Sequence, residues 1–132
     1  MRAIGYYRAS DADEGSPQVL ERSFLSYCDK REHQPARTFA DEPGTGGFGA
    51  PAYRRMVDFM RGSTNQFLVV IPDARHLGGD LVEIARALVE LEGAGARVVC
   101  IDDASPDPLQ NALKTVGVKG VSRTRSARIR EA

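Results

Sequence analysis

The first residues with the types and spacing needed for chemistry follow the first apolar run of the chain. Tyr6-Tyr7 leads directly into Arg8, and Ser10 comes two residues later. Serine is a weak nucleophile at neutral pH unless a neighbour takes its proton or stabilises the charge that its attack creates. Guanidinium groups stabilise the negative charge of a phosphoryl transition state with paired hydrogen bonds. Arg8 and Ser10 are thus candidates for phosphoryl transfer, although a loop serine beside a surface arginine is the plainer interpretation of these residues alone.

A second group of candidates follows an unbroken apolar run. Phe67-Leu68-Val69-Val70-Ile71 is typical of a central parallel strand that is buried on both faces. Asp73, Arg75 and His76 come directly after it. In open α/β sheets the working residues lie beyond the carboxyl ends of the strands. The sequence therefore predicts that these residues share one edge with Arg8 and Ser10.

The elements that must position these residues alternate along the chain. Hydrophobic spacing predicts strands over 3–7, 37–39, 66–72 and 97–101. The same signal, with prolines at helix starts and glycines at helix ends, predicts helices over 17–32, 51–61, 81–92, 107–116 and 122–131. Strand–helix alternation predicts a three-layer, doubly wound α/β fold: a mainly parallel sheet of four to five strands with helices on both faces. We expect one such domain over residues 1–104 and a proline-interrupted, basic helical tail over 105–132.

Composition and charge narrow the class of protein. At 132 residues, 42% hydrophobic and 27% charged, the chain is long enough for one globular domain, and it contains no apolar run of membrane-spanning length. Two distant cysteines, Cys28 and Cys100, are typical of buried reduced thiols, which predicts a cytoplasmic location. The net charge is zero, yet from Lys114 onward there are six basic residues and one acidic residue. The candidates for DNA phosphate contacts in this tail are Arg123, Arg125, Arg128 and Arg130.

Other classes of site fit the sequence less well. The glycines of residues 44–49 fit G-x-G-x-x-G, but Asp41-Glu42-Pro43 separate them from the preceding strand, which disfavours dinucleotide binding. A receiver-like, magnesium-dependent phosphotransfer site could use Asp41, Asp73, Asp102 and Asp103. No acid follows the first strand directly, which disfavours that site. His33 and His76 lack the companions that a zinc site needs, so we expect neither a metal nor a cofactor.

The ordered set of motifs resembles the catalytic domain of the serine recombinases, that is, the resolvases and DNA invertases. The set comprises Tyr6-Tyr7-Arg8-Ala9-Ser10, Phe39-Ala40-Asp41-Glu42 with the glycine loop, Pro51 with its helix, Val69 to Asp80, and Leu88 to Asp103. This resemblance implies site-specific DNA strand cleavage and rejoining through a phosphoserine intermediate. It implies Ser10 as nucleophile, Arg8 as its partner, and Asp73, Arg75 and His76 as further active-site residues.

The chain departs from the family pattern in its arginines. In one alignment His76 stands where the family has a catalytic arginine and Arg75 where it has an aspartate, whereas a gapped alignment matches Asp73 and Arg75 to that aspartate and arginine. In both, Gly79 stands at a second catalytic arginine, and Ala50 stands where another arginine is expected. The alternative is therefore a catalytically inactive recombinase-like module that binds DNA or a protein. The expected partners are DNA, further copies of the chain in a dimer or tetramer, and a protein that supplies DNA specificity.

Overall fold

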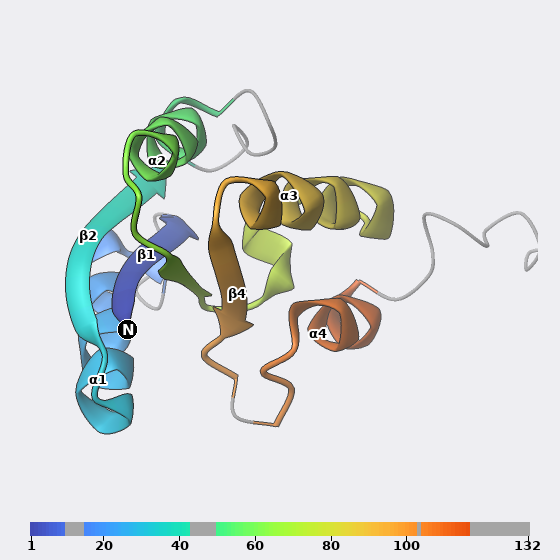
Figure 1. Cartoon of the computed structure of the whole chain (residues 1–132). Helices are drawn as coiled ribbons and strands as arrows, with labels where there is room; N and C mark the ends of the chain where they lie inside the picture. Colours follow the sequence, from blue (N-terminus) through green and yellow to red (C-terminus); the bar gives the residue numbers. More distant parts are fainter. Residues whose placement is uncertain (10–14, 43–49, 103, 117–132) are drawn as a thin grey trace, which may run out of the picture.

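The computed structural model describes residues 1–9, 15–42, 50–102 and 104–116, and it contains four strands, four α-helices and a short 3-10 helix within them (Figure 1). In chain order the elements are β1 (Arg2–Arg8), α1 (Pro17–Arg31), β2 (Gln34–Asp41), α2 (Pro51–Arg61), β3 (Phe67–Ile71), η2 (Ala74–His76), α3 (Leu81–Gly93), β4 (Ala96–Cys100) and α4 (Pro108–Thr115). The predicted alternation of strands and helices is confirmed.

The four strands form one parallel sheet in the order β2-β1-β3-β4. β3 is buried along its whole length, as its apolar sequence predicts. β2 is longer than predicted because it begins at Gln34 and includes Pro35. A register shift between Ala3 and Ile4 accommodates this proline, which lacks a backbone N–H, at the edge of the sheet.

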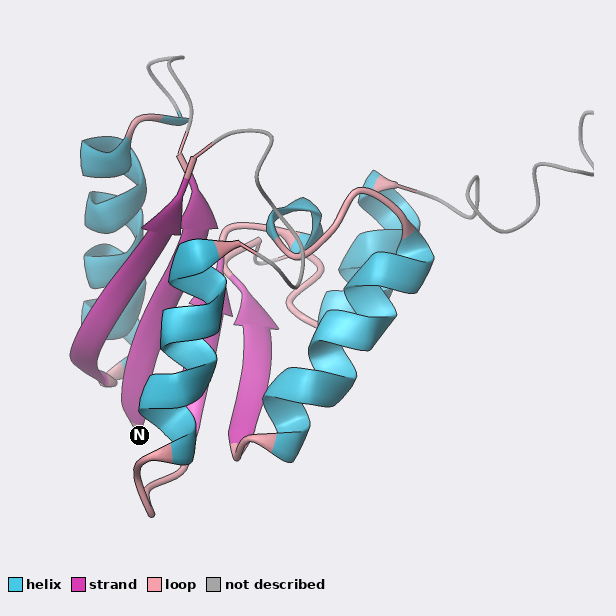
Figure 2. Ribbon diagram, turned by 90° about the horizontal axis from the view of Figure 1, so that it is seen from above, coloured by secondary structure: helices cyan, strands magenta, loops and turns pink. Residues whose placement is uncertain are grey.

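Helices cover both faces of the sheet, so the predicted three-layer architecture is confirmed (Figure 2). On one face, α1 contributes Phe24, Tyr27 and Cys28 to a core cluster with Ala3, Leu68 and Val70. On the other face, α2 and α3 pack on a larger cluster that includes Ile4, Tyr6, Val69 and Ile71. Alternation of side chains along β1 and β3 explains why consecutive residues enter different clusters.

Local signals in the sequence set the helix starts. The Ser16 side chain accepts a hydrogen bond from Val19 N, and Asp80 and Asp107 cap α3 and α4 in the same way. Gly5 lets α1 approach the sheet closely, since a Cβ at this position would lie 2.8 Å from the Phe24 ring. Glu32 follows the last residue of α1, and its φ of 60° reverses the chain toward β2.

The segment after β4 packs on the domain as far as it is described. Ala112 of α4 is fully buried in the larger core cluster, and Val116 packs against that cluster. The helix predicted over 122–131 lies outside the described residues, and the division at residue 104 stays a prediction. Cys28 and Cys100 are free and buried, as predicted, and burial raises the pKa of both thiols. Among the described helices, none is long and apolar enough to cross a membrane.

Candidate functional site

The carboxyl ends of three strands meet beside Arg8. In the sheet register Arg8 pairs with Asp41 of β2, and the N–H of Ala9 donates to the Asp41 carbonyl over 2.9 Å. From the other side, the backbone N–H of Arg8 donates to Nδ1 of His76 over 2.9 Å. Of the candidate residues, the structure thus brings Arg8 and His76 into direct contact, as the predicted shared edge requires.

Two arginine Nε donors, those of Arg8 and Arg54, are buried without a hydrogen-bond partner in the described part of the chain. Nε of Arg8 is buried and has no hydrogen-bond partner there. Arg8 follows Tyr6 by two residues, so both side chains leave β1 on the same face, and the charge of Arg8 partly offsets the rise that burial and Asp41 cause in the pKa of Tyr6. Buried donors without a partner are rare and require an explanation.

His76 is held as a neutral imidazole. Burial lowers its pKa below the ordinary value of 6.5, and the nearby charges of Arg8 and Arg75 act in the same direction against the opposing influence of Asp73. Because Nδ1 accepts the bond from the Arg8 N–H, the proton of the neutral ring is on Nε2. His76 therefore supports the backbone of Arg8 and adds no fixed positive charge to this edge.

Asp73 and Arg75 form a closed pair at the turn after β3. The guanidinium donates to both carboxylate oxygens of Asp73, each over 3.0 Å, and the Arg75 N–H donates to the same side chain over 2.9 Å. Burial alone would raise the pKa of Asp73, but these hydrogen bonds outweigh it and hold the pKa below its usual range. The Arg75 side chain is 63% exposed, so it faces solvent while its fork is bound to Asp73.

Asp41 caps a helix to which it does not belong. Residue Ala50 precedes α2 and has no side chain to cap it, yet the Asp41 carboxylate accepts from the N–H groups of Ala52 over 2.7 Å and Tyr53 over 3.0 Å. The same carboxylate accepts from the Tyr6 hydroxyl over 2.6 Å. Asp41 is only 5% exposed. It therefore ties β1, β2 and α2 together directly behind Arg8.

Asn111 is a positioning residue that sequence reasoning missed. Its fully buried carboxamide accepts from the N–H of Ala74, inside the turn that carries Asp73 and His76, over 2.8 Å. Its amide group donates to the Ser105 carbonyl over 3.1 Å. Asn111 thereby anchors α4 to the functional edge. A buried asparagine in a short helix has no sequence signal of its own, because only the tertiary contact identifies it.

The two arginines near the start of α2, Arg54 and Arg55, have different environments. Arg54 donates to Glu90 of α3 over 2.6 Å, and its guanidinium lies over the Tyr53 ring, so it is directed away from the sheet edge. Arg55 is exposed and lines a hollow of about 290 Å³ with Ala40, Asp41, Glu42 and Pro51 at the end of β2. Arg55 is therefore the arginine of α2 that lies at the functional edge.

Several predicted site residues lie outside the described part of the chain. These are Ser10, Arg123, Arg125, Arg128 and Arg130, together with Asp103 and the glycines of residues 44–49. The described carboxylates of the receiver-like alternative all have partners within the protein: Asp41 in the α2 cap, Asp73 with Arg75, and Asp102 with Lys114. Within the residues that the structure describes, no group of three or more His, Cys, Asp or Glu side chains could hold a metal ion.

Comparisons with solved structures find the same fold in recombinase domains. The catalytic domain of ISC1926 TnpA, an IS607-like serine recombinase, is 15% identical and matches 86% of this chain and 76% of its own, with a TM-score of 0.63. A resolvase family site-specific recombinase from Streptococcus pneumoniae is 14% identical over 99% of this chain and 91% of its own, also with a TM-score of 0.63. The catalytic domain of TP901-1 integrase is 15% identical over 99% and 95% of the two chains, with the same TM-score. At such identities these structures establish the fold.

The family itself comes from the sequence comparison. No curated protein matches the chain. The family model described as the N-terminal domain of resolvases, by contrast, matches residues 3–131, which is nearly the whole chain. The match includes the strand that ends at Arg8, the turn that carries Asp73 to His76, and α4. This chain belongs to the resolvase N-terminal domain family.

Proposed function

We propose that this chain is a serine recombinase-type domain that cuts and rejoins DNA through Ser10. In the forward step the Ser10 oxygen bonds to a backbone phosphorus, the bond from that phosphorus to one deoxyribose oxygen breaks, and the proton lost by serine is balanced by the proton gained by the sugar hydroxyl. Attack by a sugar hydroxyl on the phosphoserine reverses the step and rejoins a strand. Neither a net oxidation nor a nucleotide is required.

The unmatched Nε of Arg8 is the observation that carries this proposal. A buried N–H without a partner costs roughly 1–3 kcal/mol. A phosphate oxygen at this edge would satisfy it with a charge-assisted hydrogen bond. The backbone of Arg8 is held by His76 on one side, and the next residue, Ala9, by Asp41 on the other, so the guanidinium starts from a rigid base. Ser10 follows one residue later in the sequence.

The remaining cations at this edge predict a slow enzyme. Arg55 lines the hollow at the end of β2, but Arg75 is bound by Asp73 and His76 is neutral. Loss of one preorganised donor commonly lowers the rate about 10²–10³-fold. We therefore expect strand cleavage that depends on Arg8 and is far below that of a domain with a full arginine set.

DNA is the proposed substrate, and assembly into a dimer or tetramer is the proposed working state. Arg123, Arg125, Arg128 and Arg130 are proposed to contact phosphates, which position the protein without reading sequence. Sequence specificity is proposed to come from a partner protein. The cytoplasmic location and the division into residues 1–104 and 105–132 belong to the same proposal.

The test is a covalent adduct with DNA. Nicked suicide duplexes, in which the cut end diffuses away, are incubated with the protein, and adducts are separated under denaturing conditions. Adducts are expected with the unmodified chain, are absent in Ser10→Ala, and are retained in the control Ser63→Ala, whose serine lies in the loop before β3. Arg8→Lys keeps the charge but loses the fork, so it should reduce adduct formation by about 10²-fold or more. Adducts that persist in Ser10→Ala would overturn the assignment.

A second candidate function is favoured by the pairing of the arginines. Arg75 with Asp73 and Arg54 with Glu90 leave few free guanidiniums for a transition state. In this alternative the domain binds DNA and cuts nothing. A salt-sensitive shift of duplex DNA that requires residues 117–132, with no adduct on any suicide substrate, is the result expected of it.

A further inference from the structure

The sheet face under α1 is only partly covered. Its core cluster takes all of its helical members from α1, and at β4 it leaves Val99 and Ile101 only partly buried. A hollow of about 370 Å³ lies between α1 and Ile101. Parallel sheets normally have both faces covered. This concave surface is therefore a place where another molecule could bury surface of the protein.

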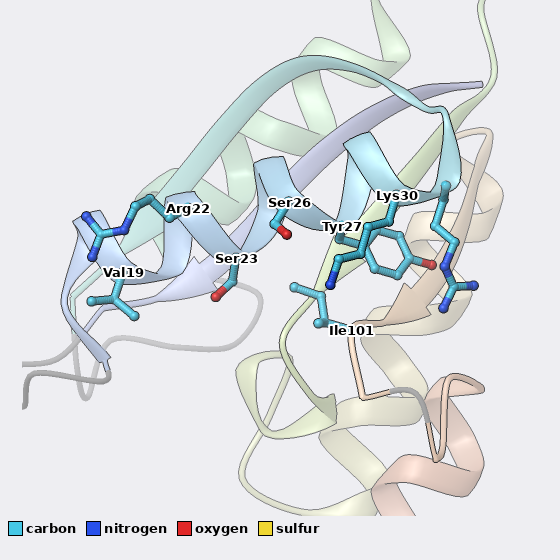
Figure 3. Close-up of a pocket in the computed structure, with 8 residues that line it drawn as sticks. Val19, Arg22, Ser23, Ser26, Tyr27, Lys30 and Ile101 are labelled. Atoms are coloured by element: carbon cyan, nitrogen blue, oxygen red, sulfur yellow. The ribbon is translucent and has the colours of Figure 1, made fainter.

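The lining of this hollow, which we call the α1 hollow, is cationic and rich in hydroxyl groups. Its described lining residues are Val19, Arg22, Ser23, Ser26, Tyr27, Lys30, Arg31 and Ile101, none of which carries a carboxylate. Figure 3 shows Arg22 at one end beside Val19, Lys30 at the other end near Tyr27 and Ile101, and the two serines between them. The Arg31 guanidinium lies 5.1 Å from the centre of the Tyr27 ring.

Two of the three basic residues of the α1 hollow, Arg22 and Lys30, are not neutralised within the described part of the chain. Neither Arg22 nor Lys30 forms an ion pair there, and both are exposed. The two residues are eight positions apart on one helix, which places their Cα atoms about 12 Å apart. Duplex DNA carries one phosphate charge per about 1.7 Å of its axis, so a duplex along this face presents roughly seven charges over that length. Exposed basic side chains and serine hydroxyls are the kinds of donor from which the oxygens of a phosphate backbone accept.

We propose that the α1 hollow binds the phosphate backbone of duplex DNA without reading its sequence. The site lies along α1 and is separate from the edge that carries Arg8 and His76. It gives the chain a second contact with DNA. This contact is with the duplex that is cut, where that duplex bends around the domain, or with another segment of DNA. The inference goes beyond the proposed function, because it needs neither Ser10 nor strand cleavage.

The test measures how DNA affinity depends on salt, in the full chain with Ser10→Ala so that no covalent product forms. Binding of a short labelled duplex of mixed sequence is followed by fluorescence anisotropy over a series of salt concentrations. Arg22→Gln combined with Lys30→Gln should lower the slope of log K against log salt by about 1.8, which is about 0.9 for each lost phosphate contact. The control combines Arg61→Gln with Arg86→Gln, which removes the same charge from the opposite face of the sheet, and should leave the slope nearly unchanged.

Each alternative outcome overturns the proposal. Equal slopes for the two double variants would mean that only overall charge matters, and no binding by the parent chain would mean that no such site exists. Poly-glutamate that competes as well as unlabelled duplex, at equal concentrations of charge, would mean a general site for acidic chains. Because Arg22 and Lys30 are exposed, thermal unfolding should be unchanged and should exclude misfolding as the cause.

A second measurement locates the contact directly. In ¹H–¹⁵N NMR spectra the amides of Ser23 and Ser26 should shift on addition of the duplex, while those of Arg86 and Val89 on α3 should not. Shifts confined to the edge around Arg8 would overturn the proposal and leave the proposed function intact. Shifts along α1, together with the absence of any covalent adduct in the unmodified chain that retains Ser10, would support the α1 hollow and count against strand cleavage.

Discussion

Replacement of Asp41 by alanine should reveal how strongly the functional edge depends on one buried carboxylate. Asp41 accepts hydrogen bonds from the Tyr6 hydroxyl and from the N–H groups of Ala52 and Tyr53, over 2.6, 2.7 and 3.0 Å. Its side chain is almost fully buried, so water cannot replace it without a rearrangement. Alanine removes all three bonds and leaves three donors at the junction of β1, β2 and α2 without an acceptor.

The magnitude follows from the number and the kind of these bonds. A hydrogen bond to a charged group contributes about 1.5–3 kcal/mol, and loss of a helix cap alone costs about 1 kcal/mol. Three bonds that share one acceptor are not independent, so we expect Asp41→Ala to lower the free energy of unfolding by about 4 kcal/mol, below the simple sum. Small domains are stable by about 5–15 kcal/mol, so the variant should fold but be severely weakened.

Urea denaturation followed by circular dichroism measures this loss as a fall in midpoint at constant slope. Asp41→Asn retains one carbonyl oxygen but turns an amide toward a donor, so it should lose about 1–2 kcal/mol. Asp58→Ala, an exposed carboxylate on the same helix α2, serves as the control and should change stability by no more than about 0.5 kcal/mol. If Asp41→Ala proves no more harmful than Asp58→Ala, the capping role assigned to Asp41 is wrong.

Three further perturbations test the roles assigned to His76, Asn111 and Gly5. The pKa of His76 is lowered in the folded state, so its contribution to stability is complete above the unfolded value of 6.5 and is lost as the pH falls through the lower folded value. Between pH 7.5 and pH 5 the free energy of unfolding should therefore fall more in the parent chain than in His76→Gln. Equal losses of stability in the two proteins would refute this contribution of His76. Asn111→Leu leaves the N–H of Ala74 without its acceptor, so it should cost about 2 kcal/mol and shift the NMR signals of the His76 ring; an unmoved ring would contradict the positioning role. Gly5→Ala places a Cβ within 2.8 Å of the Phe24 ring and should cost about 1–3 kcal/mol in thermal unfolding, whereas a neutral result would mean that α1 shifts freely.

The sheet and the order of its elements could be predicted because each left a periodic signal. The apolar run of β3 and the stripe of α3 are local patterns, and Ser16 and Asp80 mark helix starts that the structure retains. β2 was underestimated because its edge position needs few apolar residues, and Pro35 reads locally as a stop. Because the strands are parallel, the ends of β1, β2 and β3 meet, so the sequence alone predicts Arg8 and His76 at one edge.

Most of the contacts that shape this edge could not be predicted because they join residues far apart in sequence, and the one local contact has no distinctive sequence signal. Asp41 was weighed as a metal ligand, but its chemistry is that of a helix cap for α2, 11 and 12 residues away from its partners. Asn111 reaches 37 residues back to Ala74. Arg75 was predicted beside the nucleophile, yet its fork is bound by Asp73, two residues before it. A local ion pair and a remote cap have the same sequence signature as a catalytic group, since all three require a charged residue at a strand end.

The contact between Arg8 and His76 has a further consequence for how the edge works. A cationic side chain at position 76 would have no free nitrogen to accept from the Arg8 N–H. The neutral imidazole of His76 accepts this bond and fixes the backbone from which the Arg8 guanidinium extends. His76 therefore adds no positive charge to the edge, but it holds the Arg8 backbone in place. The proposed chemistry then depends on one guanidinium held in place, so protonation of His76 in acid should weaken it. The Arg8 backbone loses its acceptor, and the new positive charge lies on a ring that is no longer anchored and does not replace that support. DNA cleavage that rises steadily as the pH falls below 6 would contradict this, because it would mean that the added charge matters more than the lost support.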